Sequence, residues 1–243
     1  MRLFLALFGF VLLCGCSGEV EHDASEAEAI VQTADPARFE VFQRLPEKLS
    51  DAVVFRKERH DRLVLDEMFS GVMTEKEFLK VFLDYQSQIE RVIDATLTMT
   101  SPISPAPDFD DDDIQNGRHL DTVPGRLLNN SRLLLADAIR CWEIGKYKSC
   151  GRRYAASMRI GLCMLDDVDT MTQIRGAQVC IPTILELDLR LADGLAERLT
   201  EPARGELLNL ILKMDTSRVP GWDDSSPVAE AKRRAIRYLE DGR

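Results

Sequence analysis

Apolar side chains recur every three or four positions between residues 126 and 199, which is the spacing of one face of an α-helix. The pattern occurs twice, first at Leu127, Leu134, Leu135, Ala138 and Trp142 and then at Tyr147, Cys150, Tyr154, Met158, Leu162 and Leu165. Gly145 lies between the two series, where a tight turn over residues 145–147 can reverse the chain. The pattern predicts a hairpin of two helices with facing apolar stripes, followed by a third helix.

Residues 36–99 show the same periodicity and predict a set of N-terminal helices. Pro46 can open one of them, because the N–H that proline lacks has no partner in a first turn. The run Thr74-Glu75-Lys76-Glu77 is a capping box, so we expect another helix to begin there. Apolar residues continue at helical spacing after the capping box and predict one continuous helix that ends before Ser101. These residues are Phe82, Tyr85, Ile89, Val92 and Leu97.

Two polar residues, Arg56 and His60, interrupt the apolar face of the helix that follows Pro46. One interpretation is a polar site in a groove that binds a ligand. The other is structural, with the arginine extending its charge to solvent along its apolar stem and the histidine hydrogen-bonded near Asp61. We favour the structural interpretation and retain Arg56 and His60 as candidate ligand-binding residues.

Residues 100–125 break the helical pattern with four prolines, Pro102, Pro105, Pro107 and Pro124. Within this segment the run 108–113 carries five aspartates. Calcium prefers such oxygen ligands, but Asp113 stands where an EF-hand loop needs glycine and His119 where it needs glutamate. We expect a solvated linker, with weak cation binding by 108–113 and a partner-docking loop as the alternatives.

Helix boundaries are also predicted in the C-terminal part. Thr170 begins a second capping box, Pro182 should kink or restart the helix that follows, Thr200 with Pro202 begins another helix, and Pro227 opens the last one. The expected fold is therefore all-α, with about seven or eight helices stacked as antiparallel hairpins in a helical bundle. The expected organisation is a signal peptide (1–15), a flexible tether (16–35), N-terminal helices (36–99), a Pro/Asp-rich loop (100–125) and a C-terminal helical-hairpin block (126–243).

Composition limits the classes of partner. Of the 243 residues, 45% are hydrophobic, which is enough apolar material for a substantial core. The formal net charge is −10, and a negative surface repels phosphate backbones and anionic lipid headgroups. Nucleic-acid binding and a polybasic membrane patch are therefore disfavoured.

Residues 1–16 consist of one basic residue near the start and an apolar run that stops at Cys14-Gly15-Cys16. The run is shorter than the roughly 20 residues of a membrane-spanning helix, so it predicts an export signal. Its end, Leu13-Cys14-Gly15-Cys16, resembles the lipobox of bacterial lipoproteins, and the resemblance implies that Cys16 is the lipidated first residue of the mature protein. The alternative is an unlipidated signal peptide that is cut near Gly18.

The lipobox resemblance implies a protein of the cell envelope that faces the periplasm and is held at the membrane by its N-terminal lipid. Ser17 follows the modified cysteine in place of the aspartate associated with inner-membrane retention. We therefore expect the outer membrane in preference to the inner membrane.

Export also places the remaining cysteines in an oxidising space, where disulfides persist. Cys141 and Cys150 lie on either side of Gly145, at similar heights on the two helices of the predicted hairpin, and are a possible disulfide. Cys163 and Cys180 are offset along their helices, so we expect buried free thiols there. No close Cys-x-x-Cys pair exists, and no metal site is expected.

The residues around the turn carry a second resemblance. Gly145-x-Tyr147-x-x-Cys150-x-x-x-Tyr154-x-x-Ser157 is similar to the core of a tetratricopeptide repeat, whose small residues let two helices approach closely. Cys150 and Ser157 stand where the repeat has alanines, and no second copy follows 34 residues later. The resemblance covers one hairpin and implies helix-pair geometry.

Recognised catalytic motifs are absent from the sequence, and we expect neither a cofactor nor an enzyme activity. The leading hypothesis is a non-catalytic interaction or scaffold role at the cell envelope with a protein partner. The alternative is a small-ligand-binding protein or hydrolase with a cleft near Arg56, His60 and Tyr154. An anion-binding face is a further candidate, which we disfavour because its arginines can instead offset the acidic surface; it would comprise Arg152, Arg153, Arg159 and Arg175.

Overall fold

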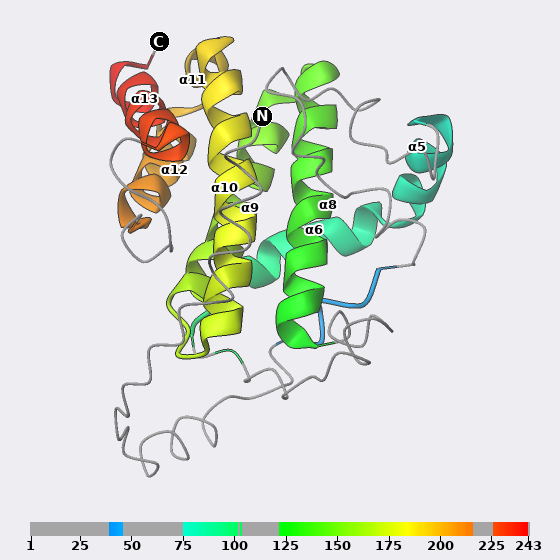
Figure 1. Cartoon of the computed structure of the whole chain (residues 1–243). Coiled ribbons are helices and arrows are strands. Elements are labelled where there is room, and N and C mark those ends of the chain that lie inside the picture. The colour runs from blue at the N-terminus through cyan, green and yellow to red at the C-terminus, as the bar shows by residue number, and fades with distance from the viewer. Residues whose placement is uncertain (1–38, 46–74, 102, 104–121, 216–225, 243) are drawn as a thin grey trace, which may run out of the picture. The chain divides into compact units, whose positions relative to one another are not determined.

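The computed structural model describes residues 39–45, 75–101, 103, 122–215 and 226–242, all within the compact unit Asp35–Arg243. These residues form helices and no strand, which confirms the all-α prediction (Figure 1). The helices are α5 (Glu75–Asp84), α6 (Gln86–Thr96), α8 (Val123–Glu143), α9 (Tyr147–Leu165), α10 (Thr170–Ala192), α11 (Leu195–Arg198), α12 (Glu201–Lys213) and α13 (Pro227–Asp241). None of these described helices is both long and apolar enough to span a membrane.

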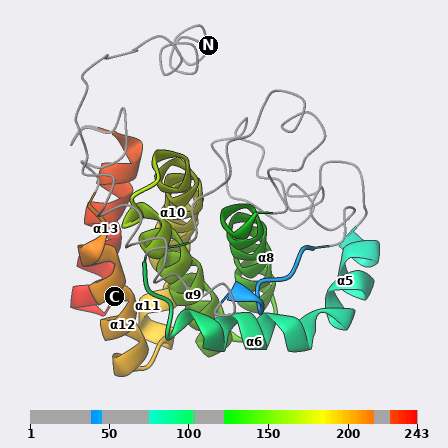
Figure 2. The same cartoon turned by 90° about the horizontal axis from the view of Figure 1, so that it is seen from below.

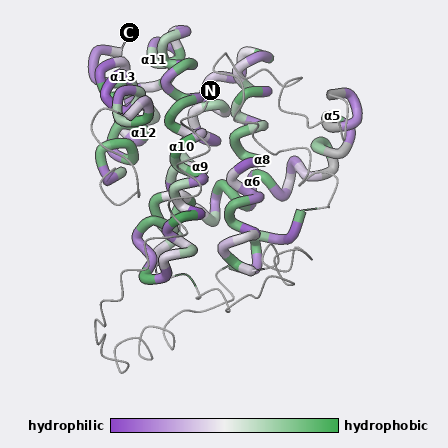
Figure 3. The backbone as a smooth tube through the Cα atoms, viewed as in Figure 1, coloured by the Kyte–Doolittle hydropathy of each residue, from purple (hydrophilic) through white to green (hydrophobic). Residues whose placement is uncertain are grey.

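The predicted hairpin around Gly145 is confirmed, with α8 and α9 packed antiparallel. Gly145 has a positive φ of 72°, which favours glycine, and the N–H of Lys146 donates to the carbonyl of Cys141 at 2.8 Å. Helix α10 returns alongside α9, so three long helices form the centre of the fold (Figure 1). Apolar residues recur along all three of them (Figure 3).

Helices α9 and α10 approach each other through two glycines that the sequence analysis did not single out. A Cβ atom on Gly176 would lie 2.7 Å from the backbone N of Leu165 and 2.9 Å from the carbonyl oxygen of Gly161. A Cβ atom on Gly161 would collide with the thiol of Cys180. The two backbones are therefore in direct contact, with no room for a side chain between them.

The predicted start of α10 is wrong, and of the kink or restart predicted at Pro182 the restart is excluded. The N-cap is Asp169 and not Thr170, because the Asp169 carboxylate accepts hydrogen bonds from the N–H and the hydroxyl of Thr172, both at 2.7 Å. Helix α10 also continues through Pro182 without a restart. An internal proline costs about 3 kcal/mol, and the packing of α10 against α8, α9 and α13 offsets that cost.

The single helix predicted after the capping box is two helices. It begins at Glu75 as expected, although Thr74 itself lies outside the described residues. The chain leaves the helical conformation at Tyr85 (φ −99°, ψ 1°), and α6 then runs in another direction (Figure 2). Phe82 before the break and Ile89 after it are both buried, so the bend keeps both in the core.

The Pro/Asp-rich loop ends earlier than predicted, because α8 begins at Val123 and not at Arg126. Thr122 is its N-cap and accepts from the N–H of Gly125 at 3.2 Å, with Pro124 in the first turn. At the other end of the loop the N–H of Ile103 donates to the Asp167 carboxylate at 2.5 Å. The acidic run 108–113 lies outside the described residues.

Segment 39–45 is fastened to the helices by two amide side chains. Nδ2 of Asn130 donates to the carbonyl of Gln43 at 3.0 Å, and Nε2 of Gln88 donates to the carbonyl of Val41. Phe39, Phe42 and Leu45 of this segment are buried in the same apolar cluster as parts of α6 and α8. In the C-terminal part, the predicted starts of α12 after Thr200 and of α13 at Pro227 are confirmed.

Candidate functional site

Of the three residues predicted to share a cleft, the structure describes only Tyr154. Tyr154 is fully buried on α9, so it cannot line an open cleft. Burial, and after it the negative charge of Glu186, raise the pKa of Tyr154. Arg56 and His60 lie outside the described residues, as does the predicted lipidation residue Cys16.

A buried ionic network joins α6, α8 and α9. Asp137, with no exposed side-chain surface, accepts from Nε of Arg153 at 2.6 Å and from Nε of Arg140 at 2.9 Å. Nη2 of Arg153 lies 2.6 Å from Oε1 of Glu90 on α6. Burial opposes the charge of Arg153, but the charge and hydrogen bond of Asp137 outweigh it, and the pKa of Arg153 is raised.

A second buried pair lies within α10, where Nη2 of Arg190 is 2.5 Å from Oε1 of Glu186. Both side chains are almost fully buried, and the Arg190 guanidinium lies 5.7 Å from the ring centroid of Trp142. The pair joins successive turns of the same helix, and each charge offsets part of the cost of burying the other. In the first network Glu90 reaches solvent, with 42% of its side chain exposed.

Cys141 and Cys150 are free, buried cysteines in the structure and not the predicted disulfide. They lie in one apolar cluster, and the Cys141 thiol is 3.6 Å from Oδ1 of Asp137. Burial and the Asp137 charge raise the pKa of Cys141 to about 11, and burial also raises the pKa of Cys150. Cys163 and Cys180 are buried and form no disulfide, as predicted.

The four arginines of the candidate anion-binding face do not share one surface. Arg153 is buried in the network with Asp137, and Arg175 is buried with Nη1 donating to the hydroxyl of Thr122 at 3.2 Å. Arg152 and Arg159 remain together at the surface of α9. The structure thus reduces the predicted face to these two residues.

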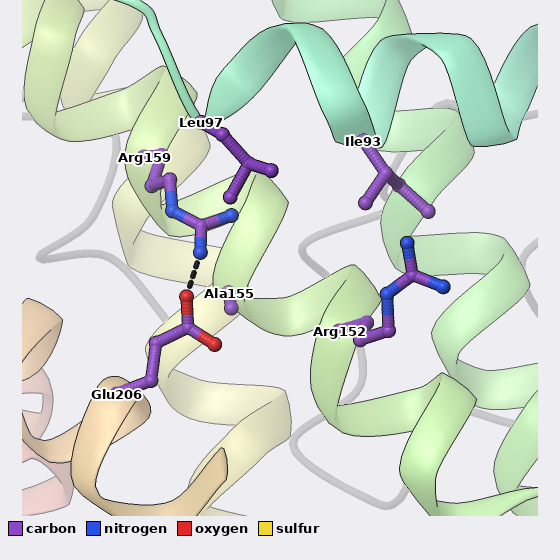
Figure 4. A pocket seen from close by; sticks show the side chains of 6 residues that line it. All are labelled: Ile93, Leu97, Arg152, Ala155, Arg159 and Glu206. Atoms are coloured by element: carbon purple, nitrogen blue, oxygen red, sulfur yellow. Dashed lines mark ion pairs between the residues drawn. The ribbon is translucent and has the colours of Figure 1, made fainter. Parts of the chain in front are cut away.

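Arg152 and Arg159 border a small pocket where α6, α9 and α12 meet (Figure 4). The pocket has a volume of about 80 Å³, which holds a few water molecules or a group of carboxylate size. Its lining residues are Ile93, Leu97, Arg152, Ala155, Arg159 and Glu206. We call it the arginine pocket.

The arginine pocket follows from helix periodicity. Arg152, Ala155 and Arg159 are three and seven positions apart on α9, so they lie on one face, and the small Ala155 leaves the space between the two guanidinium groups. Ile93 and Leu97 from the end of α6 form the apolar wall (Figure 4).

The two arginines are held differently. Arg159 pairs with Glu206 on α12 and donates from Nη1 to the Thr96 hydroxyl at 3.2 Å. Nη1 of Arg152 lies 3.3 Å from Oε2 of Glu90, and its Nη2 lies 3.5 Å from Oδ1 of Asp94. Both distances are longer than that of a strong charge-assisted hydrogen bond. The Arg152 side chain is 44% exposed, so its guanidinium is the more available of the two.

Sequence reasoning singled out Arg152 and Arg159 but missed the rest of the pocket, because its parts are far apart in the chain. Leu97 was assigned to the apolar face of a helix, but it is 63% exposed at the end of α6. Glu206 had no distinguishing context. The spacing of Arg152, Ala155 and Arg159 was the signal that could have marked one wall.

Within the described residues no group of three or more His, Cys, Asp or Glu side chains could hold a metal ion. No protein-family model, curated protein sequence or solved structure matches the chain. The arginine pocket is therefore interpreted from its own chemistry.

Proposed function

We propose that this chain is an exported, lipid-anchored protein of the cell envelope with a non-catalytic role in binding another protein. The location rests on the sequence Leu13-Cys14-Gly15-Cys16 after the short apolar run. Lipid on Cys16 would hold the helical unit at the membrane, facing the periplasm, with the outer membrane as the favoured site.

The observation that carries the binding role is the exposed face around Leu97 and Arg152. An exposed leucine, a small hollow and an available arginine lie together there. Arginine is enriched at the energetic centres of protein interfaces, and an exposed apolar side chain beside a pocket is a typical contact. The buried position of Tyr154 removes support from the alternative of a hydrolase or small-ligand cleft at that residue.

The anchor is tested by replacing Cys16 with serine and fractionating the cells. The Cys16→Ser protein should be found free of the membrane after export, and the unaltered protein should fractionate with the outer membrane. Membrane association that survives the substitution would contradict lipid anchoring at Cys16.

The binding role is tested by lysine-directed crosslinking of the unaltered protein in intact cells, followed by mass spectrometry. We expect one envelope protein to be enriched reproducibly over a sample without crosslinker. Recovery of no neighbour above that background would contradict the binding role.

A further inference from the structure

We infer that the arginine pocket binds a side-chain carboxylate of an aspartate or glutamate on a partner protein, and that Leu97 contacts an apolar residue beside it. This inference rests on the proposed binding role and names the chemistry of the partner surface.

Charge complementarity gives the first argument. The lining of the pocket contains two arginines and one glutamate, on a chain whose formal net charge is −10. Glu90 and Asp94 lie outside the lining and contact Arg152 at 3.3 and 3.5 Å with side chains that reach solvent, so they offset its charge only in part. Burial, and after it the charge of Arg152, lower the pKa of Arg159, because the two cations oppose each other across the hollow. A partner carboxylate between the two guanidinium groups would reduce that repulsion further than Glu206, Glu90 and Asp94 already do.

Donor geometry gives the second argument. Guanidinium groups present planar sets of N–H donors that match carboxylate oxygens. The long contacts of Arg152 with Glu90 and Asp94 leave it able to turn toward a new acceptor, while Arg159 is already oriented by Glu206 and Thr96. In Figure 4 both guanidinium groups border the same space below Ile93 and Leu97.

The apolar wall shows why the carboxylate should belong to a protein. Leu97 remains 63% exposed at the rim of the pocket, and a small free carboxylate would leave it uncovered. An acidic residue next to an apolar residue on a folded partner fills the pocket and covers Leu97 together.

The test places a photoreactive phenylalanine analogue at position 97 in living cells and identifies the crosslinked peptide by mass spectrometry. The matched control places the same analogue at position 83, because Leu83 is 64% exposed but lies on α5, outside the pocket. We expect position 97 to capture a partner peptide with an aspartate or glutamate beside the crosslink, and position 83 to capture no such peptide.

Charge reversal then tests the role of Arg152. Arg152→Glu should reduce the crosslinking yield at position 97 at least about tenfold, because a glutamate there repels the partner carboxylate that the arginine attracts. Arg237→Glu, at an exposed arginine of α13, should leave the yield unchanged. Changing the captured acidic residue of the partner to lysine should restore crosslinking to the Arg152→Glu protein. Circular dichroism should show both variants folded, because exposed ion pairs contribute about 1 kcal/mol or less.

The inference is overturned if the captured peptide has no carboxylate, or if the peptide comes from a second copy of this chain. It is also overturned if Arg152→Glu leaves the crosslinking yield unchanged. Its failure is distinguishable from failure of the proposed function. If lysine-directed crosslinking finds a partner that position 97 does not capture, the pocket inference fails and the binding role stands. If neither experiment finds a partner, both fail.

Discussion

The Asp137 carboxylate accepts a hydrogen bond from Nε of Arg153 at 2.6 Å, with Asp137 fully buried on α8 and Arg153 97% buried on the facing α9. Charges this deep in a protein are tolerated only when they are paired, because each loses its hydration. The pair therefore links the two helices of the hairpin where an apolar contact would otherwise lie.

Asp137→Asn should lower the free energy of unfolding by about 3 kcal/mol, because it removes the fully buried carboxylate that pairs with Arg153 and leaves that arginine the half-exposed Glu90. Asp94→Asn is the matched control, since Asp94 is 69% exposed and pairs with Arg152 at 3.5 Å, and should cost less than about 1 kcal/mol. Urea unfolding followed by circular dichroism measures both. Equal effects of the two substitutions would contradict a structural role for the buried pair.

Gly176→Ala should destabilise the protein by about 1–3 kcal/mol, because the added methyl group would press on the backbone of Leu165 and Gly161. Gly205→Ala is the control, since α12 has open space around that glycine and alanine is the better helix former. The control should stabilise the protein by about 0.5–1 kcal/mol. Thermal unfolding of the two variants compares them directly, and a neutral Gly176→Ala would mean that α9 and α10 lie further apart.

Asp169→Ala should lower stability by about 0.5–2 kcal/mol, because the N–H of Thr172 would lose its acceptor at the start of α10. Thr170→Ala should have little effect, although the sequence pattern favoured Thr170 as the cap. The urea concentrations at which the two variants are half unfolded show which residue caps α10. A larger loss for Thr170→Ala would restore the boundary predicted from sequence.

The four cysteines between residues 141 and 180 should react slowly with a thiol reagent at pH 8 in the folded protein, because all are buried. Burial raises the pKa of Cys141 to about 11 and that of Cys180 to about 12, so few thiolates form. In denaturant all four should react at once. A count of two in denaturant would show that Cys141 and Cys150 form the disulfide that the hairpin sequence suggested.

The same thiols make stability depend on alkaline pH. The unfolded Cys141 thiol ionises near its ordinary pKa of 9.0, and the folded one only near 11. The folded state therefore holds the proton more tightly, and its advantage is complete below pH 9 and is lost as pH rises toward 11. Unfolding free energies measured between pH 8 and 11 should fall, and Cys141→Ala should flatten the decline.

Local signals predicted most of the fold correctly. The apolar repeat and Gly145 were enough for the α8–α9 hairpin, because both act within a few residues of the chain. Tyr85 was misassigned because its apolar ring fits the helical repeat while its backbone does not. The restart predicted as one alternative at Pro182 does not occur, because the contacts that keep α10 continuous come from helices elsewhere in the sequence.

The candidate site was much less predictable. Arg152 and Glu206 are separated by more than fifty residues, and only the packing of α9 against α12 brings them to one pocket. Likewise, nothing near Asp137 indicates that its partner is Arg153 on the next helix. Sequence periodicity says which face of a helix is buried, but it does not say which helix covers that face.

The glycine contact between α9 and α10 has a mechanical consequence. Side chains can accommodate a small displacement by changing rotamer. Where Gly176 faces Gly161 the contact is between two backbones, so no rotamer change can accommodate a displacement. Because α10 also packs against α13, a displacement of α9 relative to α10 would disturb the packing of all three helices.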